Sequence, residues 1–191
     1  MSGSFSYHYN SQLREVPDDP LAMRAACAVL ASVLRSEDLP SADELQILGR
    51  IGPLYRILGE LDLAESYLRQ AVELAAATGN RQALLSNRLR LAQMLQWRGR
   101  IAEADSMFLN CLAECEIEPE VAPYLATACH GYGKSLFEQG RYEEAAAQFR
   151  RALDLGGAVG DSEVVEASEL ALRVAEQRIK GDYAVDAASD G

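Results

Sequence analysis

Cysteine and histidine are the residue types in this chain whose spacing could support metal binding or nucleophilic chemistry. There are four cysteines and two histidines. Cys111 and Cys115 are four residues apart, so on a helix they would share one face and could ligate zinc if two more ligands converged. His8 and His130 stand in no Cys-His or Ser-His-Asp pattern typical of a catalytic unit. No glycine-rich phosphate-binding motif is present. We expect no metal site, no cofactor and no enzymatic activity.

Cys111 is better explained by packing than by chemistry. It recurs at a position that Ala71 and Ala152 fill in neighbouring segments. Free cysteine is among the most often buried residue types. We expect a buried thiol here, and no disulfide in a cytoplasmic chain.

A repeated sequence pattern predicts the helices that carry these residues. A similar six-residue segment begins at Gly59, Gly99 and Gly140, in steps of 40 and 41 residues. Large residues stand four positions before each glycine and small residues stand seven before it: Tyr55, Leu95 and Leu136, and Gly52, Ala92 and Gly133. Small residues also follow five positions after each glycine: Ala64, Ala104 and Ala145. This period marks a stacked array in which each unit is two amphipathic helices broken at the glycine, with small residues at the helix crossings.

The order small, large, Gly, Ala, aromatic, Ala resembles the tetratricopeptide repeat (TPR) over about residues 42–160. The match is close from Ile51 to Tyr55 and from Tyr142 to Phe149. The signature tryptophan of the first helix is replaced by Leu48, Arg88 and Cys129. The period also exceeds the usual 34 residues. In this the chain is similar to the long-repeat branch found in kinesin light chains and bacterial peptide-sensing regulators. The resemblance implies an all-α, right-handed superhelix of antiparallel helix pairs, with three repeats, a half repeat at each end and about eight helices.

We expect a flexible arm over 1–18, a single helical repeat domain over 19–181 and a disordered tail over 182–191. The repeats should span about 42–78, 80–118 and 120–157, with a capping helix over 162–180. Asp19 should cap the first helix, and Ser41 with Glu44 should form a capping box on the second. The first helix is expected to turn five apolar residues inward: Leu21, Ala25, Ala28, Val29 and Val33.

The negative net charge of the chain limits the classes of molecule that it can be expected to bind. Asp and Glu number 29 against 18 Lys and Arg, giving a net charge of −11. Nucleic acid is not an expected partner, because binding it requires a basic surface that neutralises phosphates. The sequence has no run of 18 apolar residues and no amino-terminal signal-peptide pattern, so we expect no membrane association and a cytoplasmic location.

The resemblance implies that the first helix of each repeat lines a concave groove. Eight residues off the packing pattern are expected to bind a peptide there: Arg50, Arg56, Arg90, Gln93, Trp97, His130, Lys134 and Phe137. Because this set is basic and Arg can bind a carboxylate with two donors, we expect a protein or peptide partner with acidic and aromatic residues. The alternation of Phe5, Tyr7 and Tyr9 suggests that the arm itself could lie extended in the groove.

The function predicted is therefore a non-enzymatic scaffold or adaptor that binds proteins or peptides. Two alternatives stay open. One is an oligomerisation module, which leaves a homodimer open. The other is a peptide or small-ligand sensor domain of a regulatory system.

Overall fold

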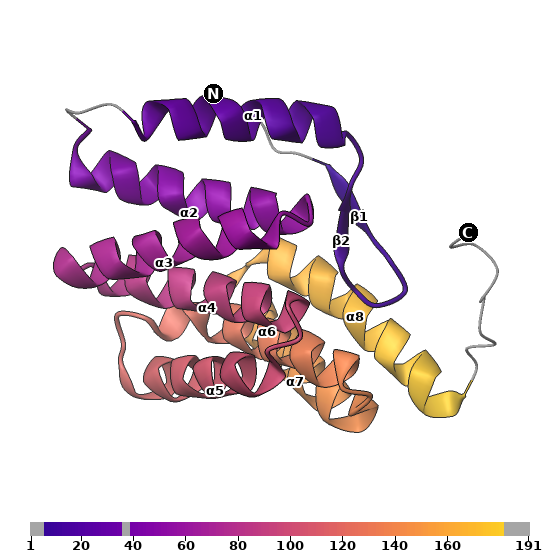
Figure 1. Ribbon diagram of the computed structural model, residues 1–191. Helices are drawn as coiled ribbons and strands as arrows, with labels where there is room; N and C mark the ends of the chain where they lie inside the picture. The colour runs from indigo at the N-terminus through magenta and orange to yellow at the C-terminus, as the bar shows by residue number, and fades with distance from the viewer. Residues whose placement is uncertain (1–5, 36–38, 182–191) are drawn as a thin grey trace. The chain divides into compact units, whose positions relative to one another are not determined.

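The computed structural model describes residues 6–35 and 39–181. Phe5 and the predicted tail at 182–191 lie outside the described residues. The chain folds into two compact units, residues 1–122 and 123–191. The first unit contains β1 (Tyr7–Tyr9), β2 (Glu15–Pro17), α1 (Pro20–Val33), α2 (Ser41–Ile57), α3 (Leu61–Ala77), α4 (Arg81–Trp97) and α5 (Ile101–Ile117). A 3₁₀ turn, η1 (Ala122–Tyr124), precedes α6 (Leu125–Glu138), α7 (Tyr142–Val159) and α8 (Ser162–Lys180) (Figure 1).

The recurring glycines end the first helix of each repeat. Gly59, Gly99 and Gly140 have φ of 76°, 75° and 75°, a left-handed conformation that glycine adopts without steric cost. At Gly59 the amide donates to the Arg56 carbonyl at 2.9 Å, and the next amide, of Glu60, donates to Tyr55 at 2.9 Å. The same pair of bonds recurs after Gly99 and Gly140. This is the Schellman motif, so the period in the sequence is a period of helix ends.

The small positions of the repeat let helices approach closely. A Cβ atom placed on Gly52 would lie 2.6 Å from Cγ of Leu68, and one on Gly133 would lie 2.6 Å from Cε1 of Phe149. Each glycine therefore accepts a large side chain from the second helix of its own repeat. The predicted alternation of small and large residues at the helix crossings is confirmed at these two positions.

In the first unit the helices form two layers. Consecutive helices pack against each other from α1 to α5, and α2 also contacts α4 directly. Helices α2 and α4 therefore make one layer, and α1, α3 and α5 make the other (Figure 1). In the second unit α7 packs between α6 and α8, which also touch each other. The prediction of an all-α array of helix pairs is confirmed, with eight α-helices in the described part of the chain. None of the described helices is long and apolar enough to cross a membrane.

Helix α1 differs from the expectation in the face that it buries. Met23 and Cys27 are fully buried. The five residues expected to face inward are all exposed: Leu21, Ala25, Ala28, Val29 and Val33. The prediction was wrong because α1 is apolar on both faces, and helical periodicity cannot choose between two apolar faces.

The start of α1 was predicted and the start of α2 was not. Asp19 caps α1, since its carboxylate accepts a hydrogen bond from the Ala22 amide at 2.9 Å. The capping box on α2 is wrong. That helix already includes Ser41, and the Glu44 amide donates to the Pro40 carbonyl at 2.9 Å, so Ser41 stands one position too far along to cap it.

Residues 7–17 form a short antiparallel hairpin that the sequence analysis did not predict. Tyr7 pairs with Pro17, and Tyr9 pairs with Glu15. The Asn10 side chain closes the turn by accepting hydrogen bonds from the amides of Gln12 and Arg14 at 2.9 and 3.0 Å. Strand β2 contacts α2, so the hairpin lies on the α2–α4 layer.

Candidate functional site

Five of the eight predicted binding residues belong to α2 and α4, the two helices of one layer. They are Arg50, Arg56, Arg90, Gln93 and Trp97. The two helices approach closely at Gly49, where a Cβ atom would lie 3.1 Å from Oδ1 of Asn87 and 3.2 Å from Nη1 of Arg90. A glycine here therefore lets polar side chains of α4 lie against the backbone of α2.

Two adjoining pockets run along this layer, with volumes of about 290 and 330 Å³. Both are lined by Gly49, Arg50 and Arg90, and we call them together the α2–α4 groove. The other residues of its first pocket are largely apolar: Tyr7, Met23, Pro53, Leu54 and Ile57. The other residues of its second pocket are more polar: Ala42, Leu45, Gln46, Asn80, Ala83, Ser86 and Asn87.

Arg90 is held in place by its neighbours on α4. Its Nη1 donates to Oδ1 of Asn87 at 3.1 Å. Asn87 is 2% exposed and donates in turn to the carbonyl of Ala83 at 2.9 Å. Arg50 lies on the facing helix and is exposed. The groove thus presents the guanidinium of Arg90, which Asn87 orients, and the exposed guanidinium of Arg50. An arginine can bind a carboxylate through two donors.

The hairpin borders this groove, since Tyr7 of β1 lines its first pocket. Nη1 of Arg56 lies 2.8 Å from Oε2 of Glu15, and both side chains are buried. The guanidinium groups of Arg56 and Arg14 lie over the ring of Trp97, at 4.6 and 5.2 Å from its centroid. Two predicted binding residues, Arg56 and Trp97, therefore already hold an acidic residue and a cation of the chain's own hairpin.

The hairpin turn carries a conformational strain. Leu13 has a φ of 60°, which a branched side chain rarely adopts, and it is 2% exposed. Burial raises the pKa of Tyr9, and the charge of Glu15 adds to this effect, so Tyr9 stays neutral beside the ion pair.

The three remaining predicted residues lie in the second unit, and all of them are buried. Nδ1 of His130 lies 2.9 Å from Oγ of Ser168 on α8. Lys134 is 2% exposed, and Phe137 is 4% exposed with its ring 5.1 Å from that of Tyr142. None of these three residues is among those that line the two pockets of the α2–α4 groove, and their part in binding stays a prediction.

The sequence analysis missed three residues that shape the site: Arg14, Glu15 and Asn87. Asn87 is buried in α4, and the repeat pattern does not indicate that its side chain accepts a hydrogen bond from Arg90. Arg14 and Glu15 lie in the segment assigned to the arm. The alternation of Tyr7 and Tyr9 before Asn10 and Ser11, which favour turns, was the signal that could have indicated a hairpin.

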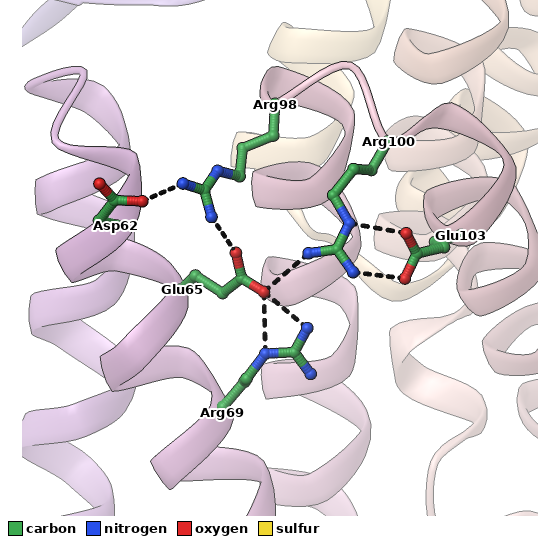
Figure 2. Close-up of polar contacts among 6 residues, drawn as sticks. All are labelled: Asp62, Glu65, Arg69, Arg98, Arg100 and Glu103. Carbon is green, nitrogen blue, oxygen red and sulfur yellow. Dashed lines mark hydrogen bonds and ion pairs between the residues drawn. The ribbon is translucent and has the colours of Figure 1, made fainter.

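A separate polar cluster links the helices of the other layer (Figure 2). Oε1 of Glu65 on α3 lies 2.6 Å from Nη2 of Arg69 and 2.9 Å from Nη1 of Arg100. Arg98 pairs with Oε2 of Glu65 and with Asp62, and Arg100 pairs with Glu103. Because three carboxylates match three guanidinium groups, the cluster is closed and ties α3 to the turn between α4 and α5. It is not a candidate binding site.

The cysteines are packing residues, as was expected for Cys111. All four are buried. Burial raises the pKa of Cys27 and of Cys111 to about 11, which keeps both thiols protonated at neutral pH. Within the ranges 6–35 and 39–181, no three His, Cys, Asp or Glu side chains come together as metal ligands would.

Comparison with known proteins agrees with the helix pairs. Models of the tetratricopeptide repeat match residues 45–78 and 82–156. A search of curated proteins found no match. Among solved structures, the TPR-like repeats of a kinesin light chain of Podosopora anserina superpose with a TM-score of 0.58 at 19% identity, covering 83% of this chain and 80% of that one. BtubC (BKLC) from P. vanneervenii superposes with a TM-score of 0.56 at 14% identity, covering 86% and 76%. At these identities the likeness concerns the fold.

Proposed function

The chain belongs to the tetratricopeptide repeat family, and we propose that it is a non-enzymatic scaffold that binds an acidic, aromatic-containing polypeptide segment in the α2–α4 groove. Repeats of this family generally mediate protein interactions, and the array offers extended surface for them. The groove gives the proposal its location and its ligand chemistry.

The charge of the groove carries the proposal. The chain has a net charge of −11, yet both charged residues among those that line the groove, Arg50 and Arg90, are arginines. A carboxylate placed between them meets attraction there and repulsion over most of the remaining surface. Electrostatics therefore favours an acidic residue at this position of the bound segment.

The apolar pocket beside these arginines supports an aromatic residue in the same segment. Pro53, Leu54 and Ile57 of α2 line it together with Met23 and Tyr7. An aromatic side chain buries a large apolar area and can stack on Tyr7. A carboxylate and a ring a few residues apart would fill the charged and the apolar part of the groove together.

The hairpin provides an example of such recognition within the chain. Glu15 binds Arg56 in a buried ion pair, and aromatic residues flank it on β1. The α2–α4 layer thus holds one carboxylate of an extended segment of this chain, Glu15, with tyrosines on the paired strand. A partner segment of the same chemistry would bind next to the hairpin or in its place.

Selection of random peptides on the full chain at low salt tests the proposal. We expect enrichment of peptides that combine Asp or Glu with Phe, Tyr or Trp. In the double variant Arg50→Glu/Arg90→Glu, the dissociation constant of a selected peptide should rise at least about tenfold, because two charge-assisted bonds are replaced by repulsion. Affinity in the parent chain should also fall as salt rises.

The matched control is Arg35→Glu/Arg173→Glu, which makes the same change of charge at two exposed arginines that line neither pocket. It should leave the affinity within about twofold of the parent. Equal losses in the two double variants would mean that only net charge matters. An unchanged affinity in Arg50→Glu/Arg90→Glu would remove the groove as the binding site.

A further inference from the structure

Helix α1 has the composition of a helix that is covered on every side. Its buried face carries Met23 and Cys27. Its opposite face carries the α1 stripe, which consists of Leu21, Ala25, Ala28, Val29 and Val33. Leu21 is 79% exposed, Val29 is 63% exposed and Val33 is 40% exposed. A helix that is apolar all round is normally buried, yet within the described chain α1 is covered on one side only.

The equivalent surface of the next repeat shows what a solvent-facing helix of this array looks like. The Arg24–Glu60 ion pair joins α1 to the turn before α3, and Glu65–Arg100 joins α3 to the turn before α5. The buried positions align α1 with α3 at an offset of 41 residues, because the buried Met23 and Cys27 then correspond to the buried Ala64 and Leu68. The first four positions of the α1 stripe then correspond to four exposed polar residues of α3: Asp62, Ser66, Arg69 and Gln70. At these four positions the outer face is polar in α3 and apolar in α1, while Val33 corresponds to the half-buried Leu74.

The α1 stripe also carries no charge. Arg24 is the single charged residue of α1, it lies outside the stripe, and Glu60 neutralises it. Two copies of a chain with a net charge of −11 repel each other over most of their surface. An uncharged apolar stripe is the place where two such copies can meet without bringing like charges together.

We propose that the α1 stripe is a self-association surface that packs against the same stripe of a second copy in a twofold-symmetric pair. Such a contact requires a self-complementary patch. Here Ala25 and Ala28 let two helix backbones approach, while Leu21, Val29 and Val33 fill the space beside them. This surface shares no residue with the α2–α4 groove, so a dimer would present two grooves.

The size of the stripe sets the expected strength of the dimer. One face of a 14-residue helix is smaller than the roughly 800 Å² per partner of a stable interface. We therefore expect a reversible dimer with a dissociation constant in the micromolar range or weaker, visible as a rise of average mass with concentration.

Sedimentation velocity of the full chain over a range of concentrations tests this proposal. Val29→Glu places two like charges against each other at the centre of the pair and should weaken association at least about tenfold. Leu21→Glu is an independent variant at the more exposed end of the stripe, and it should act in the same direction. Circular dichroism should show that both variants keep the helicity of the parent, because both side chains are exposed in the single chain.

Leu109→Glu is the control, since Leu109 is 49% exposed at the corresponding outer position of α5. It should leave association unchanged. A parent chain that is monomeric up to millimolar concentration would overturn the proposal, as would a dimer that survives Val29→Glu. If the monomer instead co-sediments with phosphatidylcholine vesicles through Val29, the stripe serves a lipid surface and the proposal is wrong.

Discussion

The ion pair between Arg56 and Glu15 attaches the hairpin to α2, and both of its side chains are buried. A buried charge is tolerated when a partner of opposite charge and hydrogen bonds compensate its loss of water. Here the carboxylate of the hairpin supplies both, at 2.8 Å. Removing one member leaves the other buried without compensation, which costs more than the intact pair contributes.

Glu15→Gln should therefore lower the free energy of unfolding by up to about 3 kcal/mol, because Arg56 loses its counter-charge while it stays buried. Urea unfolding followed by Trp97 fluorescence measures this loss, since Arg56 lies over that ring. The double variant Glu15→Leu/Arg56→Met should recover much of the stability, because it removes both charges. A double variant as unstable as the sum of the two single variants would contradict the pairing.

The close contact between Gly133 and Phe149 leads to a second prediction about single residues. A methyl group there would overlap the ring of Phe149, so Gly133→Ala should cost roughly 1–3 kcal/mol through overpacking. Gly157→Ala is a matched control within α7, since nothing lies within 4 Å of the added carbon. It should instead stabilise the helix by a few tenths to about 1 kcal/mol. Thermal unfolding of both variants decides the matter, and equal effects would refute the close helix crossing at Gly133.

At the scale of elements, the polar cluster around Glu65 (Figure 2) joins α3 of one repeat to the turn between α4 and α5 of the next. Burial acts to raise the pKa of Glu65, but the hydrogen bonds and charges of Arg69, Arg98 and Arg100 outweigh it and hold the pKa below 4.5. A carboxyl whose folded pKa is depressed stabilises the fold above its unfolded pKa and loses that contribution as pH falls through the folded value.

The stability of the parent chain should therefore fall below about pH 4.5, and in Glu65→Gln it should fall less steeply over the same window. Denaturant midpoints measured at several pH values between 3 and 7 check this expectation. Glu73→Gln, an exposed change on the same helix, serves as control and should follow the parent. A Glu65→Gln profile parallel to that of the parent would show that the cluster contributes nothing.

The hairpin is the element that shares the α2–α4 layer with the proposed ligand. If it competes for Arg56 and Trp97, weakening its attachment should strengthen peptide binding. Glu15→Gln should then lower the dissociation constant of a selected peptide several-fold, measured by fluorescence anisotropy. Gln12→Lys makes the same change of net charge at an exposed position of the turn and should have a smaller effect. An affinity that is unchanged or reduced in Glu15→Gln would mean that the hairpin is a wall of the site and not a competitor.

At the scale of the whole chain, the helices could be predicted because the same helix ends and close helix crossings recur in the repeats and select the same residue types. Gly59, Gly99 and Gly140 each fill a left-handed helix end, which few other residues tolerate, and Gly52 and Gly133 each accept a large side chain. Such positions constrain the sequence strongly, so they remain visible in it.

What could not be predicted depends on features that occur once. The hairpin has strands of three residues, too short for a periodic pattern. Its place on the α2–α4 layer depends on contacts between residues far apart in the sequence, such as the ion pair between Glu15 and Arg56, which lie 41 residues apart. The outward face of α1 was misassigned because both of its faces are apolar. The resemblance placed Lys134 in a groove by analogy, whereas its exposure depends on packing that a single sequence does not show.

The central claim is that the α2–α4 groove binds a polypeptide segment, and hydrogen–deuterium exchange of the full chain with and without a saturating selected peptide locates that contact most directly. We expect slower exchange in α2 and α4 around Gly49, Arg50 and Arg90, together with a change in the hairpin. Exchange in the outer helices α3 and α5 should change little. Protection confined to α3, α5 or α7, with α2 and α4 unaffected, would contradict the account and place the binding surface elsewhere.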